Sequence, residues 1–109
     1  MAGTFTIKNL ANGQLALAEG DVYLVPAATT AIVKTITLVN TDTVARTMNL
    51  YIKKAAGISR RIIPKDLSLA AGYSLETDEE YTLGAADAIR GDASAATIVD
   101  FTVNGVEET

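Results

Sequence analysis

The strongest constraint on the fold is an alternation of polar and apolar side chains, with a period of two, along most of the 109 residues. This pattern is typical of β-strands, because successive side chains of a strand point to opposite faces of the sheet. The clearest segments are AIVKTITLVN (31–40), RTMNLYIKK (46–54) and TIVDFTVNG (97–105). Alanine-rich segments that could form helices are short and interrupted by glycine. The sequence therefore predicts an all-β protein.

Shorter segments extend the set of expected strands: TFTIK, QLALA, DVYLVP, RRIIP, YSLET, EYTL and AIRG. Turn-forming residues such as Asn12-Gly13 lie between them. Eight to ten short strands, spaced by about 8–12 residues, are typical of a sandwich or small barrel. We therefore expect residues 1–109 to form a single domain, an antiparallel β-sandwich that is jelly-roll-like or Ig-like.

The strands at 31–40 and 46–54 are joined by a short polar link in which Asn40 and Asp42 suit a turn. We expect these two strands to pair as one antiparallel hairpin. The period of two places Ile32 on the same face of its strand as Ile36. Taken together, the apolar faces of the strands predict a core that contains Ile36, Leu38, Leu50, Ile52, Leu75, Phe101 and Val103.

Composition excludes several classes of function. The chain contains neither cysteine nor histidine, so disulfides, thiolate metal sites and the commonest general base are all missing. The net charge of −4 argues against a surface for nucleic-acid phosphates. No apolar run approaches the ~20 residues of a membrane span, and the first ten residues lack the pattern of a secretory signal. We expect a protein made in the cytoplasm that binds no cofactor, nucleic acid or membrane.

The segment SLETDEEYTL (74–83) concentrates four carboxylates: Glu76, Asp78, Glu79 and Glu80. Three interpretations are open, namely a catalytic carboxylate pair, a calcium site, and the solvated corner of a hairpin between YSLET and EYTL. A glycosidase-like pair needs an aromatic-lined cleft, but the chain has no tryptophan. The DEE run lacks the alternating ligands and the glycine of a calcium loop. We therefore expect a solvated corner, without catalytic or metal-binding residues, in a protein that is not an enzyme.

Charge is segregated along the chain. Residues 34–65 contain seven basic side chains and one acidic one, whereas residues 66–109 contain ten acidic side chains and one basic one. One interpretation is that basic and acidic strands neutralise each other within the fold. The other is that the two signs lie on different sides, so that copies of the chain meet head to tail. The second interpretation predicts an assembly interface of Lys53, Lys54, Arg60, Arg61, Glu79 and Glu80.

Three long stretches of the chain resemble a known group of proteins. They are YLVPAATTAIVKTITLVNTDTVARTMNLYI, SLAAGYSLETDEEYTLGAADAIRGDAS and TIVDFTVNGVEE, which together extend over about residues 22–108. Their strand and turn residues are similar to those of the small β-sandwich structural proteins of tailed-phage virions. The sequence departs from that pattern at Ala28, where a glycine usually follows VPA, so the turn there is expected to differ in shape.

The resemblance implies a non-enzymatic structural protein of a tailed-phage virion. Such a protein assembles symmetrically on the capsid as a decoration, or at the neck or tail, and its partners are copies of itself and other virion proteins. An alternative on the same fold is a carbohydrate-binding or adhesin module. That module would hold sugar with carboxylates and with Tyr23, Tyr73 or Tyr81, although the absence of tryptophan argues against it.

Overall fold

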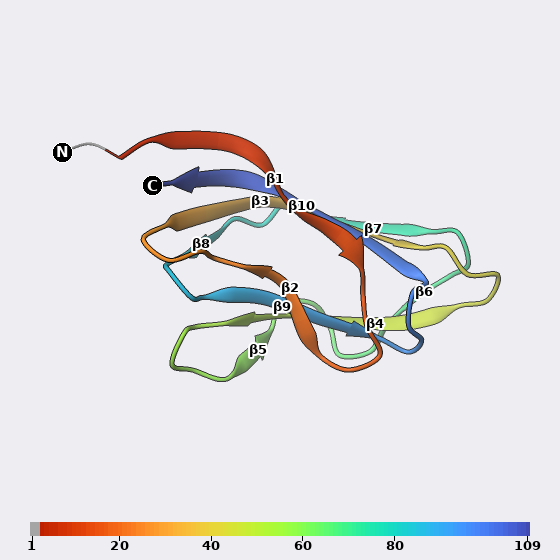
Figure 1. Ribbon diagram of the computed structural model, residues 1–109. Coiled ribbons are helices and arrows are strands. Elements are labelled where there is room, and N and C mark those ends of the chain that lie inside the picture. The colour runs from red at the N-terminus through yellow and green to blue at the C-terminus, as the bar shows by residue number, and fades with distance from the viewer. Residues whose placement is uncertain (1–2) are drawn as a thin grey trace.

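The computed structural model describes residues 3–109 and is an antiparallel β-sandwich (Figure 1). Its strands are β1 (Phe5–Gln14), β2 (Gly20–Leu24), β3 (Thr30–Asn40), β4 (Arg46–Lys53), β5 (Ser59–Arg61), β6 (Leu67–Leu69), β7 (Ser74–Thr77), β8 (Tyr81–Leu83), β9 (Ala88–Ala93) and β10 (Val99–Glu108). The all-β prediction is confirmed. Within residues 3–109 there is no helix long and apolar enough to cross a membrane.

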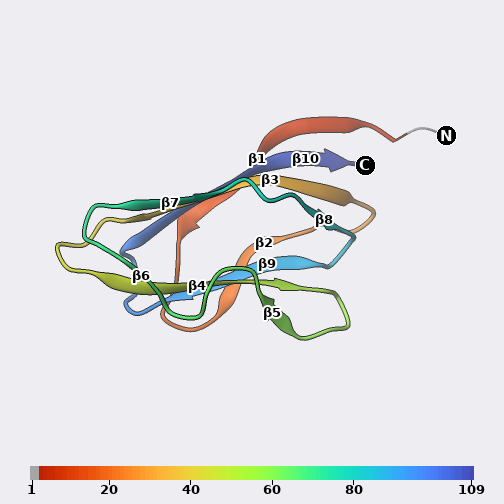
Figure 2. The ribbon, with the colours of Figure 1, turned by 180° about the vertical axis from the view of Figure 1, so that it is seen from behind.

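The strand order identifies the sandwich as a jelly roll. The first sheet has the order β1-β10-β3-β7, with β8 also paired to β3, and the second has the order β2-β9-β4-β5, with β6 also paired to β4. Partners are therefore nested along the chain: β1 with β10, β2 with β9, β3 with β7 and β8, and β4 with β5 and β6. This is one long hairpin folded over into two sheets, seen from both sides in Figures 1 and 2. The nesting selects a jelly roll over an Ig-like sandwich.

The expected hairpin between the strands at 31–40 and 46–54 is wrong. β3 belongs to the first sheet and β4 to the second, so the link between them crosses from one layer to the other. Both strands bury apolar side chains, but they do so from opposite sides of one core. Alternation predicts that a strand has a buried face. The same alternation is expected whether two strands pair side by side in one sheet or pack face to face in two.

A β-bulge at Lys34 changes which side chains of β3 point inward. The register between β3 and β10 shifts there, so that Lys34 has no partner on β10. Beyond an extra residue the inward and outward faces exchange. Val33 is therefore buried together with Ile36, whereas Ile32 lies on the outer face and is half-buried. The expectation that Ile32 shares a face with Ile36 is wrong for this reason.

The predicted core is largely confirmed. Five of its seven residues are buried, and the other two, Ile52 and Leu75, are half-buried and pack against the core. Leu15 is also buried, but the expected strand QLALA does not form, and Leu17 is exposed. The buried side chains come from both sheets, which is what fixes the two layers face to face.

Two local features differ from the expected turns. Asn12-Gly13 lies inside β1, where Gly13 pairs with Phe101; a Cβ on Gly13 would lie 3.2 Å from the Phe101 ring, so glycine makes room for that ring. Ala28 has a φ of 55°, in the left-handed region that glycine favours. The turn after VPA thus keeps a glycine-like backbone although its residue is alanine.

Candidate assembly surfaces

The acidic segment does not form a hairpin corner, because β7 and β8 do not pair with each other. Both pair with β3: β7 with residues 36–39 and β8 with residues 31–33. β7 and β8 therefore follow one another along the same edge of the first sheet, and residues 78–80 link them beside the Lys34 bulge. The Nζ of Lys34 lies 2.6 Å from a carboxylate oxygen of Glu80. The hairpin prediction was wrong because two collinear edge strands show the same alternation as two paired ones.

The four carboxylates of this segment are exposed, as expected for solvated side chains. Nowhere in residues 3–109 do three or more acidic side chains converge in a way that could hold a metal ion. The shallow hollow beside the segment is lined by Thr35, Thr37, Glu76, Thr77 and Asp78 and is open to solvent. The arrangement offers neither the buried carboxyl nor the aromatic wall of a glycosidase site.

Lys54 forms an ion pair within the fold. Its Nζ lies 2.6 Å from Asp87, a buried carboxylate between β8 and β9. Asp87 also accepts hydrogen bonds of 2.8 Å from the backbone N–H groups of Gly84 and Ala55. The Lys54 hydrogen bond, followed by the two backbone donors, lowers the pKa of Asp87. This ion pair joins two turns at one end of the sandwich.

Arg61 is also bound internally. Its guanidinium lies 5.1 Å from the centre of the Tyr51 ring, and it donates a 2.5 Å hydrogen bond to the side-chain oxygen of Asn49. The Asn49 amide, which is buried, donates in turn to Asp66 and Asp92. Of the four predicted basic interface residues, only Lys54 has an ion pair within residues 3–109, and Lys53 and Arg60 have neither an ion pair nor an internal contact of the kind that binds Arg61.

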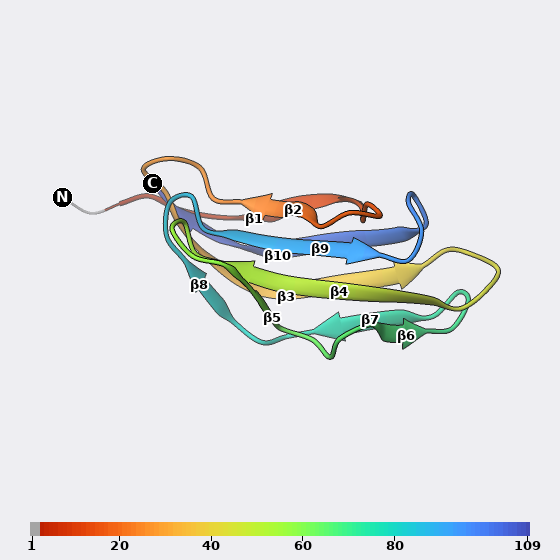
Figure 3. The same ribbon diagram turned by 90° about the horizontal axis from the view of Figure 1, so that it is seen from below.

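Four of the six predicted interface residues lie along the same edge of the sandwich: Arg60 and Arg61 on β5, and Glu79 and Glu80 between β7 and β8. β5, which carries Arg60, is an outer strand of the second sheet, and the β7–β8 line beside Glu79 is the outer strand of the first. Figure 3 shows β5, β6, β7 and β8 along one side of the molecule. The expected separation of the two signs onto different sides is therefore not observed, and they are neighbours on adjoining layers.

An apolar patch that the sequence reasoning missed lies on the outer face of the first sheet. Register places Ile7 beside Val106, and Val106 beside Ile32, with Phe5 in the next row. Phe5 and Ile7 are 69% and 87% exposed. A groove of about 270 Å³ runs along Phe5, Ile32 and Val106. We call Phe5, Ile7, Ile32 and Val106 together the β1 patch.

The β1 patch adjoins an open strand edge. Thr4 and Thr109 exchange two backbone hydrogen bonds of 2.9 Å across β1 and β10. Because hydrogen-bonding direction alternates along an antiparallel strand, the backbone groups of Phe5 and Ile7 point away from β10. Apolar side chains and free backbone groups thus occur together at the outermost strand, a combination typical of surfaces that pair with another chain.

The tyrosines expected to hold sugar do not form one surface. Tyr23 is buried, and its hydroxyl donates a 2.5 Å hydrogen bond to Glu107, which also pairs with Lys8 at 3.1 Å. Burial raises the pKa of Tyr23, and the Tyr23 hydrogen bond lowers the pKa of Glu107. Tyr81 packs against the core, so only Tyr73 presents a free ring.

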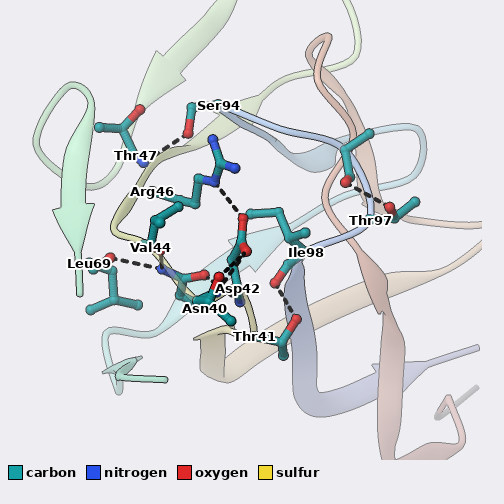
Figure 4. Close-up of polar contacts among 12 residues, drawn as sticks. Asn40, Thr41, Asp42, Val44, Arg46, Thr47, Leu69, Ser94, Thr97 and Ile98 are labelled. Atoms are coloured by element: carbon teal, nitrogen blue, oxygen red, sulfur yellow. Dashed lines mark hydrogen bonds and ion pairs between the residues drawn. The ribbon is translucent and has the colours of Figure 1, made fainter. Parts of the chain in front are cut away.

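A polar cluster around Asn40 lies at the end of the sandwich opposite the Lys54–Asp87 ion pair and connects the two sheets (Figure 4). Asn40 is fully buried, and its amide donates to the carbonyl oxygens of Val44 (3.0 Å), Leu69 (2.9 Å) and Ala70 (3.3 Å). Its side-chain oxygen accepts a 2.9 Å bond from the Asp42 N–H. Asp42 pairs with Arg46 at 2.7 Å, and the pKa of Asp42 is lowered, chiefly by that hydrogen bond. These bonds fix the links β3–β4 and β6–β7.

Comparison with known proteins finds likeness in structure alone. No protein-family model and no curated protein matches the chain. A chain in the acidic stable capsid structure of Helicobacter pylori bacteriophage KHP30 is similar, with a TM-score of 0.55 and 11% identity over 100% of this chain and 90% of that one. At that identity, the match shows that the two chains share a fold.

Two further solved structures are more distant. A chain of infectious bursal disease virus Gx strain has a TM-score of 0.47 and 10% identity, and the match covers 97% of this chain and 32% of that one. The CBM22-1–GH10 modules of Clostridium thermocellum endo-1,4-beta-D-xylanase 10B, complexed with xylohexaose, have a TM-score of 0.37 and 12% identity; 99% of this chain covers 24% of that one. This chain thus spans about a third and a quarter of their lengths, and neither likeness supports a functional argument.

Proposed function

We propose that this chain is a non-enzymatic structural protein of a tailed-phage virion that binds the capsid as a decoration. The observation that carries the proposal is the likeness to a chain in the KHP30 capsid structure. It extends over 100% of this chain and 90% of that one, so it relates two chains of similar length and not one module within a larger protein. The resemblance of residues 22–108 to phage virion proteins supports the same class.

The electrostatics of the buried carboxylates support a structural role. A general acid needs a raised carboxyl pKa. Here the buried carboxylates Asp87 and Glu107 have lowered pKa values, because each accepts hydrogen bonds that favour the ionised form. Both groups connect separate strands or turns. Such ion pairs stabilise a rigid framework, which suits a protein that presents a fixed surface to a shell.

The distribution of exposed groups supports assembly. The β1 patch places large apolar side chains in solvent beside an open strand edge, and the opposite edge of the sandwich carries charges without partners in residues 3–109. Exposed apolar patches and open edges promote association with other chains. A virion structural protein uses such surfaces in the assembled particle.

The proposal is tested with phage particles that lack this protein. Purified protein is added to isolated heads and, as a matched control, to isolated tails of the same phage, and bound protein is quantified after sedimentation. We expect saturable binding to heads at a copy number set by the symmetry of the shell. Binding to tails alone, or to neither component, would contradict capsid decoration.

A further inference from the structure

The edge formed by β5, residues 62–66 and the β7–β8 line carries both signs of charge on adjoining layers; we call it the mixed-charge edge. We propose that two copies of this chain associate through the mixed-charge edge about a twofold axis parallel to the strands. The inference rests on the proposed assembly function and specifies one contact within it, a contact of the chain with itself.

The basic half of the mixed-charge edge consists of Arg60 and Lys65. Neither of these has an ion pair to any residue that the structure describes. Arg60 pairs in register with Ile52, whose side chain packs against the core, so both lie on the inner face of the second sheet. Because β5 is an outer strand, the Arg60 side chain is exposed at the open side of the sandwich, between the two layers.

The acidic half consists of Glu76, Asp78 and Glu79, which are exposed and likewise have no ion pair within residues 3–109. Other charges nearby are neutralised, such as Glu80 by Lys34 and Asp87 by Lys54. Two cations on one layer and three anions on the other therefore remain available to a partner.

The position of these charges distinguishes between two symmetric contacts. In a twofold dimer with its axis perpendicular to the sheets, each sheet would continue into its own copy, and acids would face acids. With the axis parallel to the strands, the first sheet of one copy faces the second sheet of the other. The basic half of each copy then meets the acidic half of its partner, and this complementary contact occurs twice.

Strand direction is compatible with the same axis. Figure 3 shows β3 and β4 running in opposite directions. Since β5 is antiparallel to β4, and β8 is antiparallel to β3, β5 and β8 also run in opposite directions. Rotation about an axis parallel to the strands preserves direction, so β5 of one copy lies antiparallel to β8 of its partner. Within residues 3–109, β5 pairs only with β4 and β8 only with β3, so both strands have a free backbone edge.

The contact is tested by sedimentation equilibrium of the purified chain without capsids, so its outcome is separate from that of the head-binding test. We expect the wild-type protein to dimerise at about 50 mM salt. Its dimer dissociation constant should rise at least tenfold at about 500 mM salt, because the Debye length shortens across this range. Two charge-reversed variants, Arg60→Glu with Lys65→Glu and Glu76→Lys with Glu79→Lys, should each be monomeric with melting temperatures close to that of wild type.

An equimolar mixture of the two charge-reversed variants should regain dimers, and so should the variant that combines all four changes. Asp100→Lys with Glu108→Lys serves as the control, since it changes the net charge as much as the acidic reversal does but lies on β10, away from the mixed-charge edge; it should dimerise as wild type does. A wild-type chain that stays monomeric at low salt, or a fourfold variant that stays monomeric, would overturn the proposed contact.

Discussion

Replacing Asn40 by aspartate would test how the two sheets are held together. The substitution keeps the size of the side chain and the oxygen that accepts from the Asp42 N–H. It removes the amide group that donates to the carbonyls of Val44, Leu69 and Ala70, and it places an oxygen against them. Asn40 has no exposed surface, so water cannot replace the lost donors at the side chain itself.

The expected cost follows from the donors that are lost. Each buried polar group left without a partner costs about 1–3 kcal/mol. The amide has two N–H groups, and the exposed turn at Val44 gives one carbonyl access to water, so we expect a loss of about 3–4 kcal/mol in the free energy of unfolding at neutral pH. That is a large fraction of the ~5–15 kcal/mol that stabilises a typical domain.

The loss caused by Asn40→Asp should depend on pH. Burial and the facing carbonyl oxygens disfavour a charged side chain, so the pKa of the new carboxyl is raised in the folded state. The destabilisation is therefore full above that raised pKa and shrinks as pH falls through it, because the protonated acid can donate one hydrogen bond. Asn40→Ala, the control, cannot titrate, and its loss should not vary with pH.

Urea unfolding followed by far-UV circular dichroism, at several values from about pH 4.5 to pH 7.5, measures these differences. If Asn40→Asp unfolded within about 1 kcal/mol of wild type at neutral pH, the bonding of the two links would be wrongly described. A deficit identical for Asn40→Asp and Asn40→Ala at every pH would refute the argument about the buried carboxyl.

Three further predictions concern the core, the Glu107 contacts and the acidic segment. Leu50→Ala should cost about 2–5 kcal/mol in urea unfolding, whereas Ile7→Ala, at a side chain that is 87% exposed, should cost less than about 0.5 kcal/mol; equal losses would contradict the strand faces. Because the pKa of Glu107 is lowered in the folded state, its ionised carboxylate stabilises the fold above the pKa of an unfolded glutamate, and this stabilisation is lost as pH falls through the folded-state pKa. Glu107→Gln should therefore flatten the dependence of the melting temperature on acid pH, and an unchanged dependence would refute this. Millimolar calcium should leave the melting temperature unchanged, and a rise abolished by amide substitutions in residues 76–80 would reveal a calcium site.

The sequence predicted the strands and most of the core because each long strand buries one face, and burial imposes a period of two. It could not predict which strands pair, since β3 and β4 show the same alternation across two layers as they would in one hairpin. Nor could it place the bulge at Lys34, where the inner face passes from Val33 to Ile36. A bulge leaves the composition of a strand unchanged and alters only its register.

The candidate surfaces were predictable as charge runs but not as free charges. Lys54 and Arg61 belong to the same basic run as Arg60, yet Asp87 and Asn49 bind the first two. Those partners come from other strands and turns, which only the folded chain brings close. The exposure of Ile7 could not be predicted either. An apolar residue in an alternating strand is normally assigned to the core, whereas β1 turns this side chain outward.

Counting the copies of this chain in purified virions would test whether it decorates a capsid, as we propose. Quantitative mass spectrometry with isotope-labelled peptides gives the ratio of this chain to the major shell protein. For a decoration protein we expect on the order of hundreds of copies per particle, in a fixed ratio to the shell subunits. A count of about six or twelve would place the chain in a neck or tail ring and contradict decoration, and its absence from purified virions would contradict a virion role altogether.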